Sequence, residues 1–351
     1  MDLCGAGPIP VKIVLSHLYP ILCFWAESAA HCERDKASIY LPAMEQLDFD
    51  VLFPDRRPEG DSPLRSCQLV MLRLLKIFDY ICRKQDLRYW LDGGTLLGAV
   101  RHGGFIPWDD DVDVKMPIED YRRFLELAPH TLPYDVFLQI KETDPTHPVS
   151  WAKLRDRFSF MNDPSGPFSY SQGIPIDIFP AVYITRRQHM WRKFFCLIPP
   201  YNLSPQWPLR TWSIQHKLYS GAFAILQTIA KPILSMKPIG HAFQRWGNKG
   251  EKVWTNDYPI EWLREAFPNE IIFPLSEIRF EDAIFLCPAD PDRYLRIFYG
   301  DNYMTPPPPE KRGAHRVDGF FITGPNPHFS GLRWEDYAEK KRRAADQHVT
   351  P

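Results

Sequence analysis

Aspartate is concentrated in one short segment of the 351-residue chain, which reads WDDDVDVKM and contains Asp109, Asp110, Asp111 and Asp113. Because side chains alternate between the faces of a strand, we expect Asp109, Asp111 and Asp113 to share one face. Carboxylates crowded together repel one another and resist burial in their charged form. A divalent cation relieves this repulsion, and hard oxygen ligands favour Mg²⁺, with Mn²⁺ as the alternative. The segment therefore predicts a metal site; the competing interpretation is a solvated acidic loop.

A further carboxylate occurs in the apolar run PIDIF, where Asp177 lies between Ile176 and Ile178. An unpaired charge is costly in such a strand. We expect Asp177 either to complete the acidic cluster from a neighbouring strand or to be a buried carboxylate with its own partner.

A glycine-rich turn, DGGTLLG, precedes the acidic segment. Gly93 and Gly94 carry no Cβ, so their backbone amides can approach a phosphate, and Thr95 brings a hydroxyl to the start of an expected helix. Helix N-termini favour phosphate. Arg101 and His102 add positive donors between the turn and the acids. Together these features indicate phosphoryl transfer, whereas a Gly-Gly pair alone is usually only a turn.

Alternating helices and strands surround these residues. Ser62 is suited to an N-cap and Pro63 to the first helical position, so a helix is expected at 63–84. Residues 89–103 are expected to form a strand, a tight turn and a short helix. Periodicity predicts further helices at 118–128 and 290–300, and strands at 108–116, 134–141, 150–161, 174–184 and 278–287. This order predicts an α/β fold with helices against a sheet.

Composition divides the chain further. We expect an irregular N-terminal extension over 1–60, a catalytic core over 61–185, a basic and aromatic insertion over 186–250, the rest of the catalytic domain over 251–330 and a polar tail over 331–351.

The insertion contains no Asp or Glu, but residues 186–249 contain ten Lys or Arg and ten Trp, Tyr or Phe. Aromatic and basic side chains together favour a membrane interface, so the insertion is expected to be helical and to lie on a membrane surface. A buried helical subdomain is the alternative. A nucleic-acid partner is not expected, since the net charge is −1 and no recognition motif occurs.

The seven cysteines show no C-x-x-C spacing, which argues against a zinc site or a disulfide framework and favours a reducing compartment. The uncharged stretch at 13–26 is shorter than the roughly 20 residues of a membrane-spanning helix. We expect a cytoplasmic protein at the membrane surface. A secretory-pathway location is the alternative if residues 1–30 act as a signal.

The segment YWLDGGTLLGAVRHGGFIPWDDDVDVKM closely resembles the signature of the LicD family, which includes the fukutin-related proteins of animals. The resemblance continues through IPIDIFP at 174–180 and through 280–315. It implies a nucleotidyltransferase-like fold with a mixed sheet flanked by helices. It also implies transfer of a phospho-alcohol, such as phosphocholine or ribitol phosphate, from a CDP-linked donor to a hydroxyl of a cell-surface glycan or glycolipid.

Site residues follow from the resemblance by position. It implies that Gly93, Gly94 and Thr95, with Gly98 of the same motif, hold the donor. Asp109, Asp111, Asp113 and Asp177 would bind the metal, and Lys153, Arg155, Arg312 and His315 would contact donor or acceptor, with plain surface charge as the alternative. No structural zinc is expected, because the cysteine cluster of the animal members is missing.

The implied mechanism uses Asp113 or Asp177 as the base that accepts the proton of the attacking hydroxyl, with Asp111 also essential, and CMP leaves. Two alternatives stay open at this point. One is a nucleotidyltransferase that transfers a nucleoside monophosphate to a small hydroxyl compound, and the other is a non-catalytic scaffold on a membrane surface.

Overall fold

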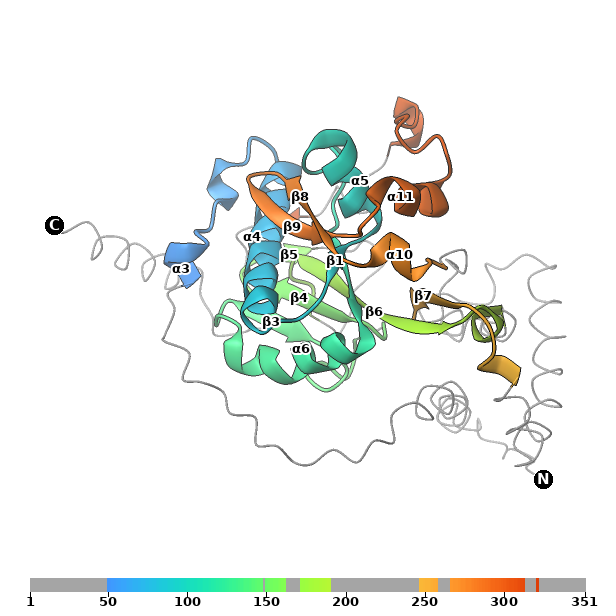
Figure 1. The fold of residues 1–351 in the computed structure, drawn as a ribbon. Coiled ribbons are helices and arrows are strands. Elements are labelled where there is room, and N and C mark those ends of the chain that lie inside the picture. The colour runs from blue at the N-terminus through green and yellow to red at the C-terminus, as the bar shows by residue number, and fades with distance from the viewer. Residues whose placement is uncertain are drawn as a thin grey trace, which may run out of the picture. The chain divides into compact units, whose positions relative to one another are not determined.

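The computed structural model describes residues 49–147, 149–161, 171–190, 246–257, 266–312 and 320–321 (Figure 1). All of them belong to the larger of two compact units, which spans 48–351. The remaining parts of the chain, including most of the predicted insertion and the whole predicted tail, lie outside the described residues.

A mixed sheet forms the centre of this unit. Its strands follow the order β1-β2-β6-β4-β3, and β7 also pairs with β6. The parallel pair is β2–β6, and the other neighbours are antiparallel. The strands are β1 (Trp90–Leu91), β2 (Asp113–Pro117), β3 (Val136–Gln139), β4 (Ala152–Asp156), β6 (Pro175–Thr185) and β7 (Lys252–Asn256). The predicted α/β class with a mixed sheet is confirmed.

Three helices frame the sheet: α4 (Pro63–Lys84), α5 (Gly93–His102) and α6 (Ile118–Thr131). The predicted start of α4 is confirmed, since the Ser62 side chain accepts a hydrogen bond from the Arg65 amide. Phe78 of α4 and Phe124 of α6 pack with ring centroids 5.1 Å apart, and both helices contact β6. The two helices therefore cover the sheet together.

The register of the sheet separates an apolar from a polar set of side chains. Val114, Ile178 and Ala152 are register partners on β2, β6 and β4, and all three are fully buried. Their chain neighbours Asp113, Asp177 and Lys153 form the adjacent row and point to the opposite face. The apolar row forms part of the core, and the polar row is available for chemistry.

The C-terminal part of the domain adds smaller elements beside α5. They are α10 (Asn269–Ile272), the hairpin of β8 (Ser276–Phe280) and β9 (Ala283–Cys287), α11 (Pro291–Tyr299) and η4 (Pro309–Lys311). A separate two-stranded pair joins β5 (Phe160–Met161) to β10 (Phe320–Phe321). Figure 1 shows α11 next to α5, and the contacts between these helices agree.

The last twelve residues of the predicted N-terminal extension take part in the folded domain. They include α3 (Phe49–Leu52) and η1 (Arg57–Glu59). The buried Arg57 guanidinium lies 2.7 Å from Asp156 at the end of β4 and 2.8 Å from Asp55. The buried ion pair of Arg57 with Asp156 links the segment before α4 to the sheet.

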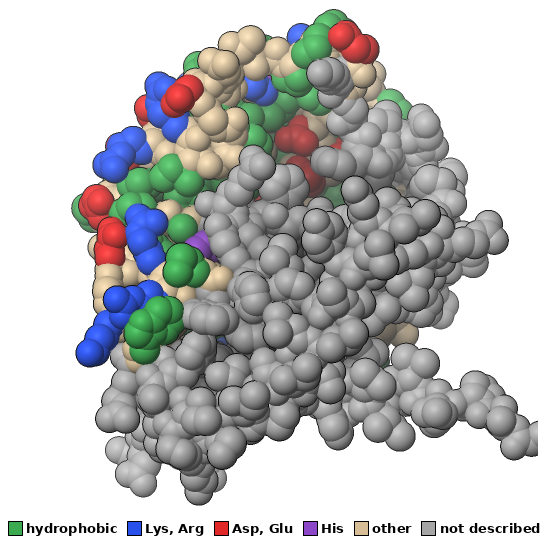
Figure 2. All heavy atoms as spheres, turned by 90° about the vertical axis from the view of Figure 1, so that its right-hand side faces the viewer, with side chains coloured by type: hydrophobic (Ala, Val, Ile, Leu, Met, Phe, Trp, Pro, Cys, Tyr) green, Lys and Arg blue, Asp and Glu red, His purple; other side chains and the backbone are tan. Residues whose placement is uncertain are grey.

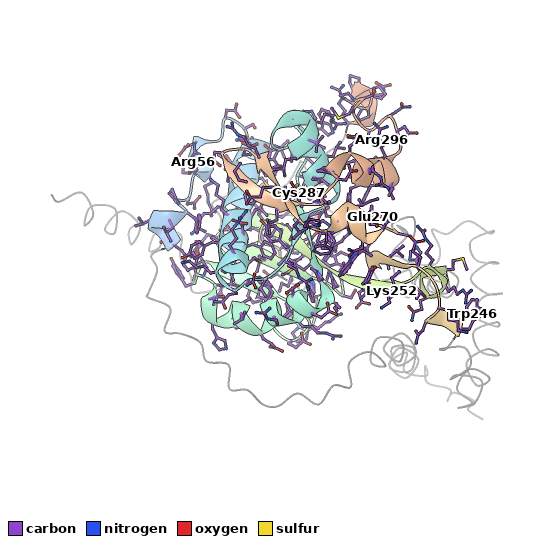
Figure 3. All side chains as sticks on the ribbon, viewed as in Figure 1. Arg56, Trp246, Lys252, Glu270, Cys287 and Arg296 are labelled. Carbon is purple, nitrogen blue, oxygen red and sulfur yellow. The ribbon has the colours of Figure 1, made fainter. Side chains whose placement is uncertain are left out.

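Of the predicted insertion, residues 186–190 and 246–250 are described, and 191–245 lie outside the described residues. At its edges the Arg187 guanidinium lies over the Trp246 ring, 5.0 Å from the centroid. Trp246 and Lys252 lie toward one end of the β6–β7 pair (Figure 3). Across the described ranges, the helices are too short or too polar to span a bilayer.

Candidate functional site

The acidic segment approaches the sheet as a loop and becomes a strand only at Asp113. The expectation of a strand over the whole of 108–116 is therefore wrong at its start. A turn closed by the hydrogen bond from the Asp109 amide to the Ile106 carbonyl, 2.9 Å, directs the chain toward β2. Pairing with β6 begins at Val112, whose carbonyl accepts from the Asp177 amide at 2.8 Å.

Asp113 and Asp177 are brought together by the parallel register of β2 and β6, in which they are direct partners. Lys153 is the partner of Asp177 on the other side, on β4. The Lys153 ammonium forms an ion pair with the Asp177 carboxylate. The three side chains form one row across the sheet, so Asp177 has a positive partner of its own beside the acidic cluster.

The start of α5 lies against the acidic side chains. A Cβ on Gly93, which has φ +48°, would lie 3.2 Å from Asp113 Oδ2. A Cβ on Gly94 would lie 2.9 Å from Asp109 Oδ2 and 3.9 Å from Asp111 Oδ1. The two glycines thus let three carboxylates approach the positive end of the helix dipole.

Thr95 has a structural partner in this arrangement. Its buried hydroxyl accepts a hydrogen bond from the Asp113 amide at 2.8 Å. The Asp92 amide donates to the Asp113 carbonyl at 3.0 Å. The backbone amide and the backbone carbonyl of Asp113 are therefore both hydrogen-bonded to residues at the start of α5. The Thr95 hydroxyl therefore fixes the backbone of Asp113.

A buried ion pair beneath the site was not anticipated from the sequence. Asp92 accepts from Lys115 at 2.7 Å and from the Tyr294 hydroxyl at 2.5 Å, and all three residues are buried. A lysine inside the apolar strand DVKMP was the available signal, because a buried ammonium requires an acidic partner.

Charge crowding is concentrated on Asp113. Burial, and then the charges of Asp111, Asp177 and Asp92, raise the pKa of the Asp113 carboxyl well above its usual value, while Lys153 opposes the shift. Without a cation, this carboxyl therefore holds its proton more strongly than an ordinary aspartate.

Tyr299, the last residue of α11, is a site residue that sequence reasoning missed. Its hydroxyl lies 3.8 Å from the point where a Gly93 Cβ would be. Burial, and then the charges of Asp113, Asp92, Asp109 and Asp111, raise the pKa of the Tyr299 phenol. The proximity of α11 to α5 arises in the tertiary fold, and only membership in the segment 280–315 could have drawn attention to this tyrosine.

Basic and aromatic side chains form a rim on the α5 side of the acidic loop. The Arg312 guanidinium lies over the Trp108 ring at 4.7 Å from the centroid, and His102 contacts the same ring edge-on at 6.2 Å. Arg101 donates to the Tyr303 carbonyl at 2.9 Å. Burial lowers the pKa of Arg101, the charges of Tyr299 and Asp109 oppose this shift, and the charge of Arg312 adds to it. We call Arg101, His102, Trp108 and Arg312 the basic rim.

Other predicted residues have different environments. Arg155 is buried and donates to Gln139 Oε1 and to the Gly173 carbonyl, so these contacts give it a structural role. Gly98 permits close packing, since a Cβ there would lie 2.5 Å from the Gly104 carbonyl oxygen. His315 lies outside the described residues.

The donor set partly fits Mg²⁺. Within the described ranges, no three His, Cys, Asp or Glu side chains converge on one point as a ready-made metal site. Mg²⁺ commonly uses only one or two carboxylates and completes its shell with water and substrate phosphates. Asp109, Asp111 and Asp113 at the α5 start supply hard oxygen donors of this kind. Figure 2 shows acidic side chains in a recess of the surface.

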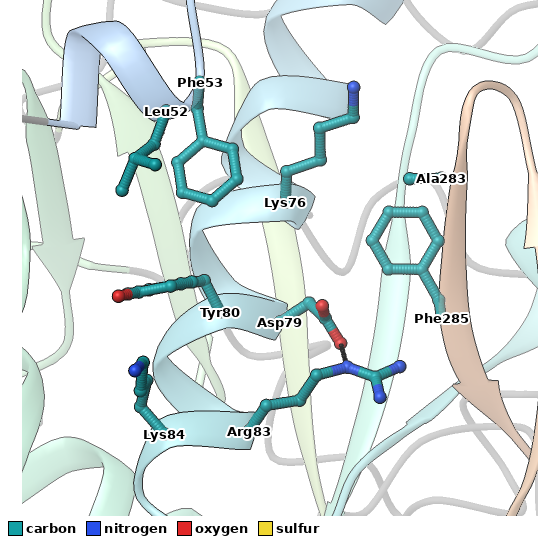
Figure 4. A pocket seen from close by; sticks show the side chains of 9 residues that line it. All are labelled: Leu52, Phe53, Lys76, Asp79, Tyr80, Arg83, Lys84, Ala283 and Phe285. Carbon is teal, nitrogen blue, oxygen red and sulfur yellow. Dashed lines mark hydrogen bonds and ion pairs between the residues drawn. The ribbon is translucent and has the colours of Figure 1, made fainter.

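A cavity of about 490 Å³ lies elsewhere, between α4, the α3 region and the β8–β9 hairpin (Figure 4). Two of its cations have carboxylate partners, Lys76 with Asp282 and Arg83 with Asp79, both at 2.7 Å. None of the described site residues lines this cavity, so it is separate from the acidic cluster. Its lining consists of Leu52, Phe53, Lys76, Asp79, Tyr80, Arg83, Lys84, Ala283 and Phe285.

Comparison with known proteins agrees with the resemblance. Residues 86–204 match the family model described as LicD/FKTN/FKRP, nucleotidyltransferase domain. The chain is 29% identical over 281 residues to the lipopolysaccharide cholinephosphotransferase LicD of Haemophilus influenzae, covering 74% of this chain and 98% of that protein.

Two further similarities are shorter. An uncharacterized protein of Rickettsia typhi is 28% identical over 156 residues, covering 38% of this chain and 50% of that protein. The human ribitol 5-phosphate transferase FKRP is 65% identical over 34 residues, covering 10% of this chain and 7% of that protein. Residues 86–204 are thus similar to the nucleotidyltransferase domain of the LicD/FKTN/FKRP family, and the similarity to the Haemophilus protein extends beyond these residues.

Proposed function

We propose that the protein transfers a phospho-alcohol from a CDP-linked donor to a hydroxyl group of a cell-surface glycan. The observation that carries the proposal is the row of Asp113, Asp177 and Lys153 beside the glycine start of α5. Similarity to the Haemophilus cholinephosphotransferase over 98% of that protein's length supports the reaction class.

Asp109 and Asp111, which approach Gly94, are the residues that would hold Mg²⁺, with Asp113 beside them. When bound, Mg²⁺ supplies positive charge that offsets the charge of the donor phosphates. The basic rim is the protein's own source of positive charge for the same phosphates, through Arg101 and Arg312.

The acceptor hydroxyl needs a base to take its proton. Asp113 suits this role through its position beside Gly93 at the start of α5, where the donor phosphates would bind. Asp177 is the less available acceptor because Lys153 holds it in an ion pair. The hydroxyl oxygen then bonds to the phosphorus that carries the alcohol, the bond from this phosphorus to the oxygen of CMP breaks, and CMP leaves with the bonding electrons.

We also propose that the insertion at 186–250 binds the membrane surface, which suits an acceptor carried on a lipid. Its basic and aromatic composition supports this role. Flotation with anionic vesicles tests it, and full-length protein that stays at the bottom of the gradient would remove this part of the proposal.

Thermal stability with a ligand panel tests the reaction class. A ligand that binds only the native state raises the melting temperature. We expect a rise with Mg²⁺ and one of CDP-choline, CDP-ribitol or CDP-glycerol, and loss of that rise in Asp111→Asn. A rise with CTP or ATP alone would favour nucleoside monophosphate transfer, which the name of the matching domain also allows. An unchanged melting temperature with every ligand of the panel would argue for a non-catalytic protein.

A further inference from the structure

Gln68 of α4 is hydrogen-bonded to the loop that carries the acidic cluster. Its buried side-chain amide donates to the Asp109 carbonyl at 3.0 Å and to the Ile106 carbonyl at 3.5 Å. These two residues are the ends of the turn that directs the chain toward β2, since the Asp109 amide donates to the Ile106 carbonyl at 2.9 Å. One amide group on α4 therefore holds both ends of this turn.

Arg65, one helical turn earlier on α4, fixes the orientation of that amide. Its guanidinium donates to Gln68 Oε1 at 3.2 Å. An arginine side chain only donates hydrogen bonds, whereas a glutamine amide has one accepting and one donating end. Because Oε1 accepts from Arg65, the NH₂ group of Gln68 faces the two carbonyls of the turn.

Glu281, at the tip of the β8–β9 hairpin, completes this network. Its carboxylate accepts from the Arg65 guanidinium at 3.1 and 2.7 Å and from the Phe105 amide at 3.1 Å. Gly104 permits this approach, because a Cβ there would lie 2.5 Å from Glu281 Oε1. Burial opposes ionisation of Glu281, but the hydrogen bonds from Arg65 and from the Phe105 amide lower the pKa of this carboxyl below its usual value. The hairpin thus supplies Arg65 with an ionised partner.

The turn determines where two of the acids lie. Asp109 and Asp111 precede Asp113, the first residue of β2, and so lie outside the register of the sheet. A Cβ on Gly94 would meet the carboxylate oxygens of both residues, which places both beside the start of α5. Gln68 provides a fixed point at one end of this segment, and the start of β2 provides the other.

We propose that Gln68 is a positioning residue of the transfer site, whose hydrogen bonds to the turn hold Asp109 and Asp111 where the cation and the donor phosphates would bind. Arg65 and Glu281 support this role by fixing the orientation of the Gln68 amide. The proposal rests on the proposed phospho-alcohol transfer and adds residues on α4 and on the hairpin to its machinery.

Two substitutions break the network at different points, and a third is the matched control. Gln68→Met removes the amide, and Glu281→Ala removes the carboxylate that holds Arg65. The control is Glu277→Ala. Glu277 also lies on the β8–β9 hairpin and also accepts from an arginine of α4, Arg83, at 2.8 Å. Arg83 lies about 27 Å from Arg65 along α4.

Two measurements without a donor test the positioning role. Hydrogen exchange of the metal-free protein, followed by mass spectrometry, should be several-fold faster over 105–112 in Gln68→Met and Glu281→Ala, because the turn has lost hydrogen bonds that hold it closed. Mn²⁺ binding, followed by electron paramagnetic resonance, should be several-fold weaker in the same two variants. Glu277→Ala should match the wild type in both measurements.

Steady-state turnover of a CDP-alcohol separates positioning from a loss of folded protein. Gln68→Met and Glu281→Ala should need several-fold more Mg²⁺ for half-maximal turnover and should regain most of kcat when Mg²⁺ is saturating. Destabilisation alone would lower kcat and leave the Mg²⁺ requirement unchanged. Thermal melting establishes which variants are folded, and Glu281→Ala carries the test if Gln68→Met does not fold.

Weaker Mn²⁺ binding with faster exchange in a protein that turns over no CDP-alcohol would support the positioning role and remove the proposed function. Wild-type Mn²⁺ affinity in the folded variants would overturn the positioning role at any exchange rate and leave the proposed function standing. Equal weakening in Glu277→Ala, or a wild-type protein that binds no Mn²⁺, would overturn it as well.

Discussion

Asp113 and Asp177 are direct partners on the parallel strands β2 and β6, yet only Asp177 has a lysine as its next neighbour across the sheet. The two carboxylates therefore have unequal surroundings. Asp177 is paired with Lys153, whereas Asp113 faces Asp111 and Asp92 as well as Asp177. Unequal surroundings of neighbouring acids commonly separate their roles in catalysis.

The crowding at Asp113 predicts a pH-dependent stability in the metal-free protein. Burial and three neighbouring acids raise its folded-state pKa, so this carboxyl favours the folded state at acidic pH and loses that contribution as the pH rises through the raised value. Asp113→Asn cannot ionise. It should melt above wild type at about pH 8, and the gap should close toward about pH 5.

Differential scanning calorimetry across this pH range measures the gap. About 1 kcal/mol corresponds to a shift of 2–4 °C in a domain of this size. An equal gap at every pH would show that Asp113 has no raised pKa in the folded protein.

Gly94→Ala tests the close approach of acids to α5. The new Cβ would lie 2.9 Å from Asp109 Oδ2 and would displace that carboxylate. We expect at least tenfold weaker Mn²⁺ binding, measured by titration. Gly103→Ala is the control, because its Cβ meets no atom within 4 Å, although an alanine at φ +71° costs about 1 kcal/mol of stability. Equal Mn²⁺ affinity in both variants would contradict the role of Gly94.

The buried pair of Lys115 and Asp92 predicts a stability effect. The atoms lie 2.7 Å apart and both side chains are at most 5% exposed. Lys115→Met leaves a buried carboxylate without its cation and should lower the free energy of unfolding by about 3 kcal/mol. Adding Asp92→Asn should recover part of the loss. Urea unfolding measures both, and equal stability of the single and double variants would speak against this pairing.

Arg312 and Arg155 had the same predicted role, contact with donor or acceptor, but their variants should behave differently. Arg312→Ala removes a rim cation that stacks on Trp108 and should raise the donor KM with little loss of stability. Arg155→Ala leaves Gln139 and the Gly173 carbonyl without their donor and should lower the unfolding free energy by about 2 kcal/mol. Steady-state kinetics and urea unfolding of both variants measure these effects. A loss of stability in Arg312→Ala and a raised donor KM in a stable Arg155→Ala would contradict the two roles.

Local signals in the sequence predicted much of the scaffold. The cap at Ser62 and the periodic apolar residues after it located α4, and the apolar run around Asp177 located the strand β6. The alternation of side chains wrongly predicted a strand at 109–112, because a turn that begins at Ile106 precedes the strand there. The start of β2 is therefore set by pairing with β6 rather than by the residue pattern alone.

Contacts between distant segments account for what was missed. Tyr299 lies near Gly93 because α11 packs on α5, and the buried Arg155 donates to Gln139 of the neighbouring strand. Neither fact has a local signal. The sequence thus pointed to the acids and to Lys153, Arg101 and Arg312, but not to Tyr299 or to the buried Lys115–Asp92 pair.

Release of CMP from a CDP-alcohol in the presence of Mg²⁺ and a glycan acceptor tests the central claim most directly, with wild type and Asp111→Asn compared side by side. We expect turnover by the wild-type protein and a loss of about a hundredfold to a thousandfold in the variant, of the size seen when a group that stabilises transition-state charge is removed. Both proteins should melt as folded domains. Wild-type turnover by Asp111→Asn would contradict the account.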